Sequence, residues 1–181
     1  MTVNQVVQII KNGGVGVLPT DTLYGLVGSA LSKKAVERIY ELRRRNHQKP
    51  MIILIGSFQY LKLFGISFAG RPDNRRRMLK KIWPGPVSVI LSLPRRQSIL
   101  RKFRYLHRDT KTLAFRLPKK PALIQFLKKT GPLAAPSANL EGRPPARTAS
   151  QAKKCFGDQV DFYLNGGRLA GLPSTLIQIL R

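Results

Sequence analysis

The stretch VGVLPTDTLYGL, residues 15–26, decides how the fold of this chain is interpreted. Residues 15–18 are short and apolar and end at Pro19, which is typical of a buried strand. Residues 20–25 form the predicted exit loop of that strand and carry two hydroxyls, a carboxylate and a glycine. Ligands often bind at such strand ends in α/β sheets, but Asp and Thr side chains also stabilise ordinary turns. Taken alone, the loop favours a turn over a site.

Helices and strands alternate on both sides of this stretch. Apolar residues recur at helical spacing over 3–10 and stop at a Gly-Gly pair, and Ser32 is placed to cap a helix that runs to about Arg45. The other predicted helices cover 58–64, 74–82, 122–129 and 149–156, and the other predicted strands cover 51–55, 87–93, 112–116, 133–135, 161–164 and 175–180. This interleaving predicts an α/β fold, with a single domain over residues 1–181 and one twisted mixed sheet flanked by helices.

The charge of the chain is its most unusual bulk property. It has 33 Lys and Arg against 8 Asp and Glu, a net charge of +25, which exceeds what solubility requires. Nucleic acid is the anionic partner that fits best, although a membrane surface, a nucleotide substrate or a generally basic proteome would give the same sign. Residues 94–111 are rich in Arg and Lys and poor in periodicity, so we predict a mobile basic surface loop there, solvated or in contact with RNA.

Several classes of chemistry lack the residues they need. Cys155 is the single cysteine, so the fold has no internal disulfide, and it forms no metal-ligand pattern with His47 and His107. The nucleotide-binding glycine motifs are absent, and Ser137 lacks the nucleophile-elbow context. No apolar stretch of about 18 residues and no leader-like N-terminus occurs, so we expect a cytoplasmic protein without a membrane segment or a metal site.

A basic segment, RRRNHQKP at 43–50, joins a predicted helix to a predicted strand. Positive charge at the C-terminus of a helix is favoured by the helix dipole, which is a purely structural explanation. Alternatively, Arg43 and Arg45 point the same way if the helix unwinds, and with Lys49 they could clamp a triphosphate.

Three further segments place small and polar residues beside strands. WPGPVS at 83–88 is a rigid turn that leads into a strand, and Ser88 could lie near a phosphate there. Alternatively, the segment only packs Trp83 into the core. APSANLEGRPP at 135–145 follows a buried strand and would bring Ser137, Asn139 and backbone amides close to a ligand. GLPST at 171–175 opens the last strand and suits either a close ligand approach or any tight loop.

Together these segments resemble the threonylcarbamoyl-AMP synthase family, in the short YrdC-like form of the YrdC/Sua5 group. The resemblance covers nearly the whole chain. It rests on PTDTLYGL at 19–26, the basic pair before KP at 49–50, WPGP at 83–86, FRLP at 115–118, PSANLEGRP at 136–144 and PST at 173–175. Each motif is weak by itself, but their identity and order together are specific.

The resemblance implies a twisted sheet with a basic concave cleft and an L-threonylcarbamoyladenylate synthase, a nucleotidyltransferase. Such an enzyme joins L-threonine and bicarbonate to ATP, normally with Mg²⁺, and releases diphosphate. A separate threonylcarbamoyl transferase complex then uses the product to form N6-threonylcarbamoyladenosine (t6A) at position 37 of tRNA. Contact with tRNA or double-stranded RNA is a further expectation, and the alternative is a non-catalytic RNA-binding YrdC-like paralogue.

The resemblance also assigns residues to roles. The basic pair and the Ser-x-Asn pair of the family, which act on the ATP phosphates and the adenylate, correspond to Arg43, Arg45, Ser137 and Asn139. Further ATP contacts correspond to Lys49, Ser88, Ser137 and Arg143, and the threonine contacts to Thr22, Arg116 and Ser174.

Two positions depart from the family pattern. Arg43 stands where the family has Lys, and an arginine is bulkier and more dispersed in charge at a close phosphate contact. Leu54 stands where longer members often carry a histidine near threonine, although short forms accept an aliphatic residue.

Overall fold

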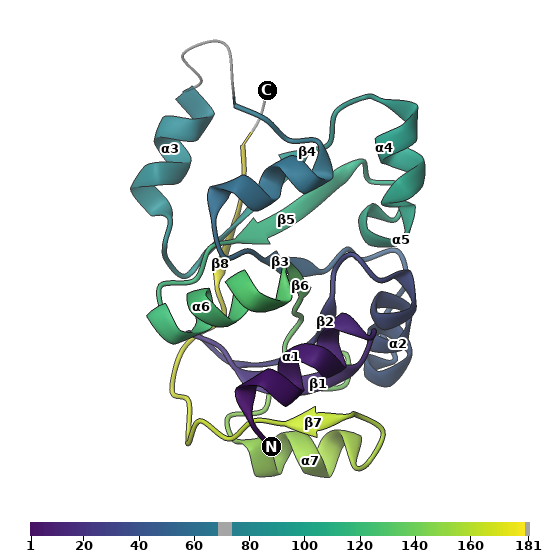
Figure 1. Cartoon of the computed structure of the whole chain (residues 1–181), viewed down its shortest axis with the longest axis vertical. Helices are drawn as coiled ribbons and strands as arrows, with labels where there is room; N and C mark the ends of the chain where they lie inside the picture. The colour runs from purple at the N-terminus through teal and green to yellow at the C-terminus, as the bar shows by residue number, and fades with distance from the viewer. Residues whose placement is uncertain (69–73, 180–181) are drawn as a thin grey trace.

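The computed structural model describes residues 1–68 and 74–179, and its centre is a mixed eight-stranded sheet (Figure 1). The strands are β1 (Val15–Pro19), β2 (Tyr24–Ser29), β3 (Ile52–Leu54), β4 (Val87–Ser92), β5 (Thr112–Arg116), β6 (Leu133–Ala134), β7 (Phe162–Tyr163) and β8 (Thr175–Gln178). The helices are α1 (Val3–Lys11), α2 (Lys33–Arg43), the 3-10 helix η1 (Phe58–Phe64), α3 (Asn74–Ile82), α4 (Gln97–Lys102), α5 (Arg104–His107), α6 (Pro121–Thr130) and α7 (Ala149–Phe156).

The sheet has the order β7-β1-β2-β6-β3-β5-β4-β8. The pairs β1/β7, β3/β5 and β4/β8 are parallel, whereas β1/β2, β2/β6, β3/β6 and β4/β5 are antiparallel. The lower part of Figure 1 holds β7, β1 and β2, and the upper part holds β5 and β4. The mixed α/β architecture predicted from the sequence is therefore confirmed.

Alternating side chains of the inner strands separate two cores. In β1, Val17 belongs to the larger core and Leu18 to the smaller one, and in β3 Ile53 and Leu54 divide in the same way. Successive residues of a strand point to opposite faces, so the two cores lie on the two faces of the sheet. The smaller core holds the buried residues of α1 and α6, and the larger core holds those of α2, α3, α5 and α7.

The exit loop after β1 is shorter than predicted, because a strand follows it directly. Tyr24 and Gly25 belong to β2, which pairs with β1 as an antiparallel hairpin. The sequence did not predict this strand, YGLVGS, because it lacks the β-branched pattern of its neighbours. Its glycines allow close packing: a Cβ on Gly28 would lie 3.1 Å from the Cβ of Ala35 in α2.

The prediction of a basic loop over 94–111 is wrong. The segment contains α4 and α5, and Phe103 and Leu106 between the charged residues are buried in the larger core. Apolar residues at 99, 100, 103 and 106 lie at helical spacing, which the many Arg and Lys between them obscured. Burial of this stripe against η1 and β5 stabilises both short helices.

The other boundaries match the prediction or move by one or two residues. The helix predicted to about Arg45 ends at Arg43, where Arg44 takes a left-handed conformation with φ of 48°. Ser32 caps this helix as predicted, since its side chain accepts the backbone N–H of Ala35. The predicted strand over 175–180 is observed over Thr175–Gln178, and Leu180 lies outside the described residues.

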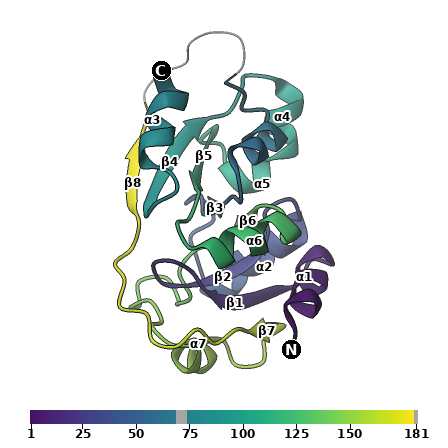
Figure 2. The same cartoon turned by 60° about the vertical axis from the view of Figure 1, so that its left-hand side comes forward.

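One long segment connects the two ends of the sheet. After β7 the chain runs along the side of the molecule without regular structure to β8, as Figure 2 shows in yellow-green to yellow. We call residues 165–174 of this connection the strap.

Candidate active site

A cavity of about 150 Å³ opens where β1 ends and β2 begins. Segments that are far apart in the sequence form its wall, and the polar members of the wall are Thr20, Thr22, Arg116, Ser137 and Ser174. The wall is assembled by backbone bonds, because Gly25 bridges to Ser137 and the N–H of Leu26 donates to the carbonyl of Pro136. The PTDT loop and the Ser-x-Asn turn thus share one cavity.

Arg116 is the charged group of this cavity wall and is almost fully buried. Its Nη1 donates to Thr22 Oγ1 at 3.0 Å, and its Nη2 donates to Asp21 Oδ1 at 3.0 Å and to Thr20 Oγ1 at 3.4 Å. The other carboxylate oxygen of Asp21 accepts the backbone N–H of Lys119. Burial lowers the pKa of Arg116, and the Asp21 charge opposes that shift.

The Nε of Arg116 has no hydrogen-bond partner among the described residues, although the atom is buried. Leaving a buried, charged donor unpaired is costly. Arg116 therefore places a buried guanidinium on the cavity wall, held by the side chains of the PTDT loop.

Ser174, the last residue of the strap, is hydrogen-bonded to Ser88 of β4. Their Oγ atoms lie 2.8 Å apart, and Ser88 itself is fully buried behind the cavity wall. Ser88 therefore reaches the cavity through Ser174 and fixes the hydroxyl that the end of the strap presents.

Tyr24 lines the cavity and also holds the first part of the strap. Its hydroxyl donates to the carbonyl of Gly167 at 2.7 Å and accepts the N–H of Gly166 at 2.9 Å. At Gly171 the strap passes so close to the PTDT loop that a Cβ there would lie 2.4 Å from the carbonyl oxygen of Thr22. The strap is thus a fixed part of the cavity rim.

Arg43 points inward, beneath the Ser-x-Asn turn. Its Nε donates to the carbonyl of Asn139 at 2.9 Å, and its Nη2 donates to Asn139 Oδ1 at 3.2 Å and to Ser137 Oγ at 3.4 Å. Burial, with the nearby charge of Arg45, lowers the pKa of Arg43 to about 10, so it stays charged at neutral pH. Its contacts fix the position of Ser137.

Asn139 continues this network away from the cavity. Its Nδ2 donates to the carbonyls of Leu140 at 2.7 Å and Arg143 at 2.6 Å. All polar atoms of the Asn139 side chain are therefore engaged, and the turn that follows is closed by them. Arg143 contributes its backbone here, and its side chain is exposed.

Arg45 and Lys49 lie on the outer side of the same turn, close to Glu141. Arg45 donates to the carbonyls of Lys49 and Pro50, and Lys49 Nζ lies 2.9 Å from Glu141 Oε1. The N–H of Asn46 donates to Glu141 Oε2 at 2.6 Å. That N–H and the Lys49 ammonium lower the pKa of Glu141. The cations on this side are paired with groups of the protein.

The structure therefore divides the predicted site residues into three groups. Those on the cavity wall are Thr22, Arg116, Ser137 and Ser174. Those that contact wall residues from behind are Ser88, Arg43 and Asn139. Those that lie outside the wall are Arg45, Lys49 and Arg143. Leu54 pairs with Arg116 in the sheet but is buried in the smaller core, away from the cavity wall.

Sequence reasoning missed three residues that shape the site. Asp21 and Thr20 hold Arg116, and Tyr24 holds the strap. All three belong to the PTDTLYGL stretch, so their presence near a site was visible, but no pattern in one sequence links Asp21 to a residue 95 positions away.

The described residues offer little else for metal or membrane binding. No three His, Cys, Asp or Glu side chains within 1–68 and 74–179 come together in a way that could hold a metal ion. No helix in the described part is long and apolar enough to cross a membrane.

A cavity with hydroxyls, a buried arginine and a Ser-x-Asn turn at the strand ends of an α/β sheet is characteristic of a protein that binds a small anionic ligand. The model of the Sua5/YciO/YrdC family, described as telomere recombination, matches residues 8–181. The chain belongs to this family, which confirms the resemblance noted in the sequence.

Curated relatives carry the name threonylcarbamoyl-AMP synthase. The protein of Nitrosococcus oceani is 34% identical over 172 residues, which cover 93% of this chain and 88% of that protein. The protein of Klebsiella pneumoniae is 34% identical over 153 residues, which cover 84% of this chain and 77% of that protein. These relatives support an enzyme of the same type, with a nucleotidyltransferase-like reaction.

Solved structures agree with the fold. Pyrococcus abyssi Sua5 complexed with L-threonine matches with a TM-score of 0.83 and 29% identity, over 98% of this chain and 50% of that one. E. coli YciO matches with a TM-score of 0.82 and 29% identity, over 99% of this chain and 84% of that one. The chain thus spans about half the length of the Sua5 chain that it matches.

Proposed function

We propose that this protein is an L-threonylcarbamoyladenylate synthase that acts through residues 1–181 as one YrdC-like domain. It joins L-threonine, bicarbonate and ATP to give L-threonylcarbamoyl-AMP, diphosphate and water. The observation that carries the proposal is Arg116, a buried guanidinium bonded to Thr22 on the wall of a cavity of about 150 Å³. A small amino acid fits that volume and supplies the carboxylate.

In this proposal the threonine carboxylate pairs with Arg116, and the hydroxyls of Thr22 and Ser174 contact the rest of the amino acid. The threonine amine and bicarbonate form a carbamate with loss of water. The carbamate oxygen then attacks the α-phosphorus of ATP, the bond from that phosphorus to the bridging oxygen of the β-phosphate breaks, and diphosphate leaves. No covalent enzyme intermediate is required.

The protein's part is to position the reactants and stabilise charge. Ser137, held by Arg43 and Asn139, lies next to the α-phosphate, and Arg45, Lys49 and Arg143 are the cations available for the outer phosphates. Mg²⁺ accompanies ATP and neutralises its phosphates. Mg²⁺ bound to ATP is commonly held by the phosphates and by waters, so it needs no dedicated protein cage.

The product serves t6A formation at position 37 of tRNA, through a threonylcarbamoyl transferase complex that consumes the adenylate in the cytoplasm. A mixed carbamic–phosphoric anhydride is an activated acyl donor, so a transferase is the class of enzyme that must follow.

The test is diphosphate release by the purified protein with ATP, bicarbonate and L-threonine. We expect release that depends on both threonine and bicarbonate. Diphosphate release that does not depend on threonine would contradict the proposal. Replacing threonine by serine, valine or simple amines tests the related possibility of another carbamoyl acceptor, for which one of these would outperform threonine.

The net charge of +25 favours one rival, a non-catalytic RNA-binding YrdC-like paralogue. The rival predicts salt-sensitive binding of tRNA or double-stranded RNA while the diphosphate assay stays silent. ATP binding without turnover in the same preparation would support it.

A further inference from the structure

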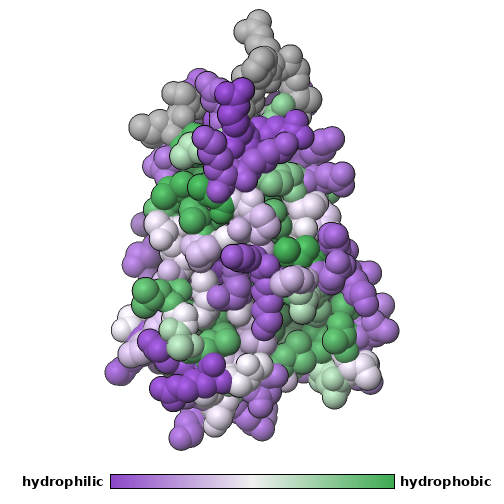
Figure 3. All heavy atoms as spheres, turned by 90° about the vertical axis from the view of Figure 1, so that its left-hand side faces the viewer, coloured by the Kyte–Doolittle hydropathy of each residue, from purple (hydrophilic) through white to green (hydrophobic). Residues whose placement is uncertain are grey.

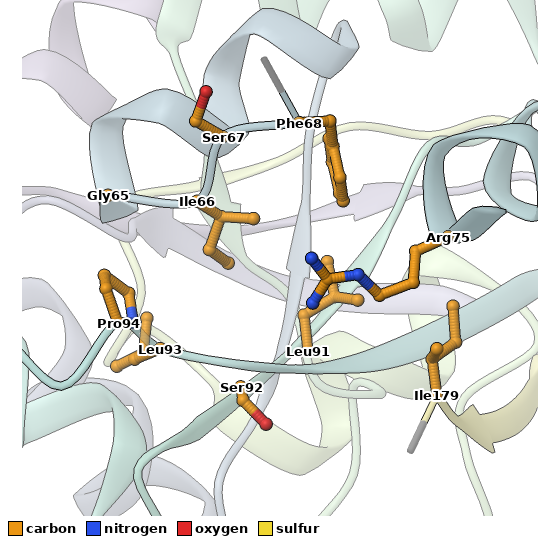
Figure 4. A pocket seen from close by; sticks show the side chains of 10 residues that line it. All are labelled: Gly65, Ile66, Ser67, Phe68, Arg75, Leu91, Ser92, Leu93, Pro94 and Ile179. Carbon is orange, nitrogen blue, oxygen red and sulfur yellow. The ribbon is translucent and has the colours of Figure 1, made fainter. Parts of the chain in front are cut away.

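A cavity of about 360 Å³ lies between α2 and the turn that follows α5, on the right-hand side of the molecule in Figure 1. His47 of the basic segment 43–50 lines this cavity, together with Glu37 of α2 and Arg108 of the turn. The cavity of about 160 Å³ in Figure 4 has no lining residue from the basic segment or from the active-site wall. Figure 3 views the molecule from the opposite side, where hydrophilic and hydrophobic side chains are mixed over the surface. Of these features, the cavity between α2 and α5 is the one that meets a segment of the proposed site.

Tyr40 of α2 is the centre of a small stack beside this cavity, and its side chain is fully buried. The guanidinium carbon of Arg108 lies 4.2 Å from the centre of the Tyr40 ring, within the range of a cation–π contact. The ring of His47 stacks on that of Tyr40, with their centres 5.0 Å apart and 18° between their planes. Glu37, one turn earlier on α2, accepts a hydrogen bond from Arg108 Nη2 at 2.7 Å and lies 3.8 Å from His47 Nδ1. We call Tyr40, His47 and Arg108 the stack.

The hydroxyl of Tyr40 connects the stack to the basic segment. It donates to the backbone carbonyl of Lys49 at 2.9 Å, and the same carbonyl accepts Arg45 Nε at 3.2 Å. The backbone N–H of Arg45 in turn donates to the carbonyl of Tyr40 at 3.0 Å. Burial raises the pKa of Tyr40, so its hydroxyl stays protonated at neutral pH and remains a donor. Residues 45–49 are therefore folded back onto Tyr40.

Arg108 lies in a turn of unusual backbone conformation. Arg108, Asp109 and Lys111 have φ of 45°, 65° and 58°, in the left-handed region that L side chains rarely adopt. Such conformations persist where surrounding contacts hold them. Here the bond from Arg108 to Glu37 and its contact with the Tyr40 ring hold the turn against α2. The turn after α5 thus supports the basic segment through Tyr40.

The basic segment needs such support because it carries four Lys and Arg and no acidic residue. Glu141 supplies one counter-charge, since its carboxylate lies 2.9 Å from Lys49 Nζ and accepts the N–H of Asn46. In the proposed reaction the phosphates of ATP replace Glu141 as the partner of Lys49. The bond from Tyr40 uses the carbonyl of Lys49 and not its ammonium, so phosphate does not compete for it. The stack therefore continues to hold the segment while ATP is bound.

We propose that Tyr40 and Arg108 are positioning residues for the ATP side of the reaction. Tyr40 holds the carbonyl of Lys49, Arg108 holds the ring of Tyr40, and together they fix the cations Arg45 and Lys49 for the phosphates. This inference rests on the proposed function, which assigns those two cations to ATP. Neither Tyr40 nor Arg108 lies on the wall of the active-site cavity, so both act through the basic segment.

The first test compares Tyr40→Phe with Tyr105→Phe as the matched control. Each change removes one hydroxyl that donates to a backbone carbonyl at 2.9 Å, that of Lys49 for Tyr40 and that of Ala30 for Tyr105. For Tyr40→Phe we expect an ATP KM raised about fivefold, which corresponds to one net hydrogen bond, with kcat and the threonine KM within about twofold of wild type. Tyr105→Phe should leave all three constants within about twofold. Thermal unfolding checks that both variants keep the fold.

Arg108 is tested with Arg108→Gln, which removes the cation over the ring. Arg104→Gln is the control, because it removes an exposed ion pair with Asp109 from the same turn. We expect Arg108→Gln to raise the ATP KM about threefold to tenfold, and Arg108→Lys, which retains a cation, to recover part of the loss. The amide of Lys49, which donates to the carbonyl of Asn46 at 3.1 Å, should exchange about fivefold faster in Tyr40→Phe and in Arg108→Gln.

An ATP KM of wild type in Tyr40→Phe and Arg108→Gln would overturn the proposal, even if the Lys49 amide exchanged faster, because the stack would then serve folding alone. Equal rises of the ATP KM in the two controls would overturn it as well. Binding of ATP alone separates this inference from the proposed function. If the two variants bind ATP more weakly than wild type and the controls, but the wild type shows no threonine-dependent diphosphate release, the synthase reaction is contradicted and the positioning role stands. A wild type that does not bind ATP would contradict both.

Discussion

Arg116 and Arg43 are both buried arginines whose pKa burial lowers, yet their surroundings differ. Arg116 is held by side chains of one loop, has Asp21 as its counter-charge and keeps a buried Nε without a partner. Arg43 donates to the backbone and side chain of Asn139 and to Ser137, and has no carboxylate within ion-pair distance among the described residues. Arg116 thus lies on the cavity wall itself, whereas Arg43 fixes the turn that carries the wall residue Ser137.

This difference shows that the two sides of the cavity, around Arg116 and around the Ser-x-Asn turn, are built differently. Around Arg116 the donors are fixed by the PTDT loop, so threonine binding at the proposed site needs little rearrangement. Near the Ser-x-Asn turn the half-buried Arg45 and the exposed Lys49 are paired with protein groups. In the proposed reaction, ATP binding on that side exchanges those partners for phosphates.

The largest effect is expected for Arg116→Met. Asp21 then loses its buried cation, and removing one partner of a buried pair costs about 3–5 kcal/mol. Urea unfolding should show the loss as a lower midpoint, and threonine-dependent diphosphate release should fall by about 100-fold or more.

The double variant Asp21→Asn with Arg116→Met separates stability from ligand binding. With no unpaired carboxylate left, it should regain much of the lost stability while threonine-dependent turnover stays low. If the single variant Arg116→Met kept the threonine KM of the wild type, the assignment of Arg116 to the threonine carboxylate would be contradicted.

Arg43→Lys tests the other side of the comparison. A lysine keeps the charge but cannot bond both the carbonyl of Asn139 and Ser137 from one fixed plane. We expect a loss of about 1–3 kcal/mol in stability and an ATP KM raised about tenfold, with the threonine KM little changed. Arg45→Lys, on the half-exposed neighbour, is the control and should change less.

The opposite result is informative in the same experiment. If Arg43→Lys leaves the ATP KM unchanged or lowers it, position 43 contacts phosphate directly and the bonds to the Ser-x-Asn turn are secondary. That outcome would remove the distinction between the two arginines.

The sequence predicted much of the fold because most strands are apolar runs that end at Pro, Gly or polar clusters. It failed at β2, whose Gly28 packs closely against α2, and at α4 and α5, where Arg and Lys hid the apolar stripe of Phe103 and Leu106. These elements are stabilised by tertiary contacts that local patterns do not report.

The candidate site was predictable as a set of segments but not as a geometry. The motifs brought Thr22, Arg116, Ser137 and Ser174 to attention, and the structure places all four on one cavity wall. The inward direction of Arg43 was not predictable, because it depends on a turn 96 residues away in the chain.

Tyr24→Phe tests whether the hydroxyl of Tyr24 fixes the strap at the edge of the site that contains Arg116. The change removes the bonds to Gly166 and Gly167 and a longer one to Asn165 Oδ1. It should loosen residues 165–171, with about tenfold faster amide exchange and a threonine KM raised a few-fold. Tyr163→Phe is the matched control, since that hydroxyl donates at 2.7 Å to Gly157, outside the strap. Equal exchange of the strap in both variants would contradict the role of Tyr24.

The smallest effect is expected for Glu141→Gln, which frees Lys49 and Arg45 for phosphate. The ATP KM at pH 7 should fall by about two- to fivefold, the range typical of an exposed ion pair. A raised ATP KM would instead mean that Glu141 positions the cations for ATP.

The pH dependence of this contact has a defined sign. The folded-state pKa of Glu141 is lowered from 4.5. Its contribution to folding stability is therefore complete above about pH 4.5 and is lost as the pH falls through the lower, folded-state pKa. The amide signal of Asn46, which donates to Glu141, should therefore titrate in the wild type at acidic pH and not in Glu141→Gln. An Asn46 signal that titrates alike in both proteins would show that Glu141 does not anchor the basic segment, and Arg45 would then be held only by the carbonyls of Lys49 and Pro50.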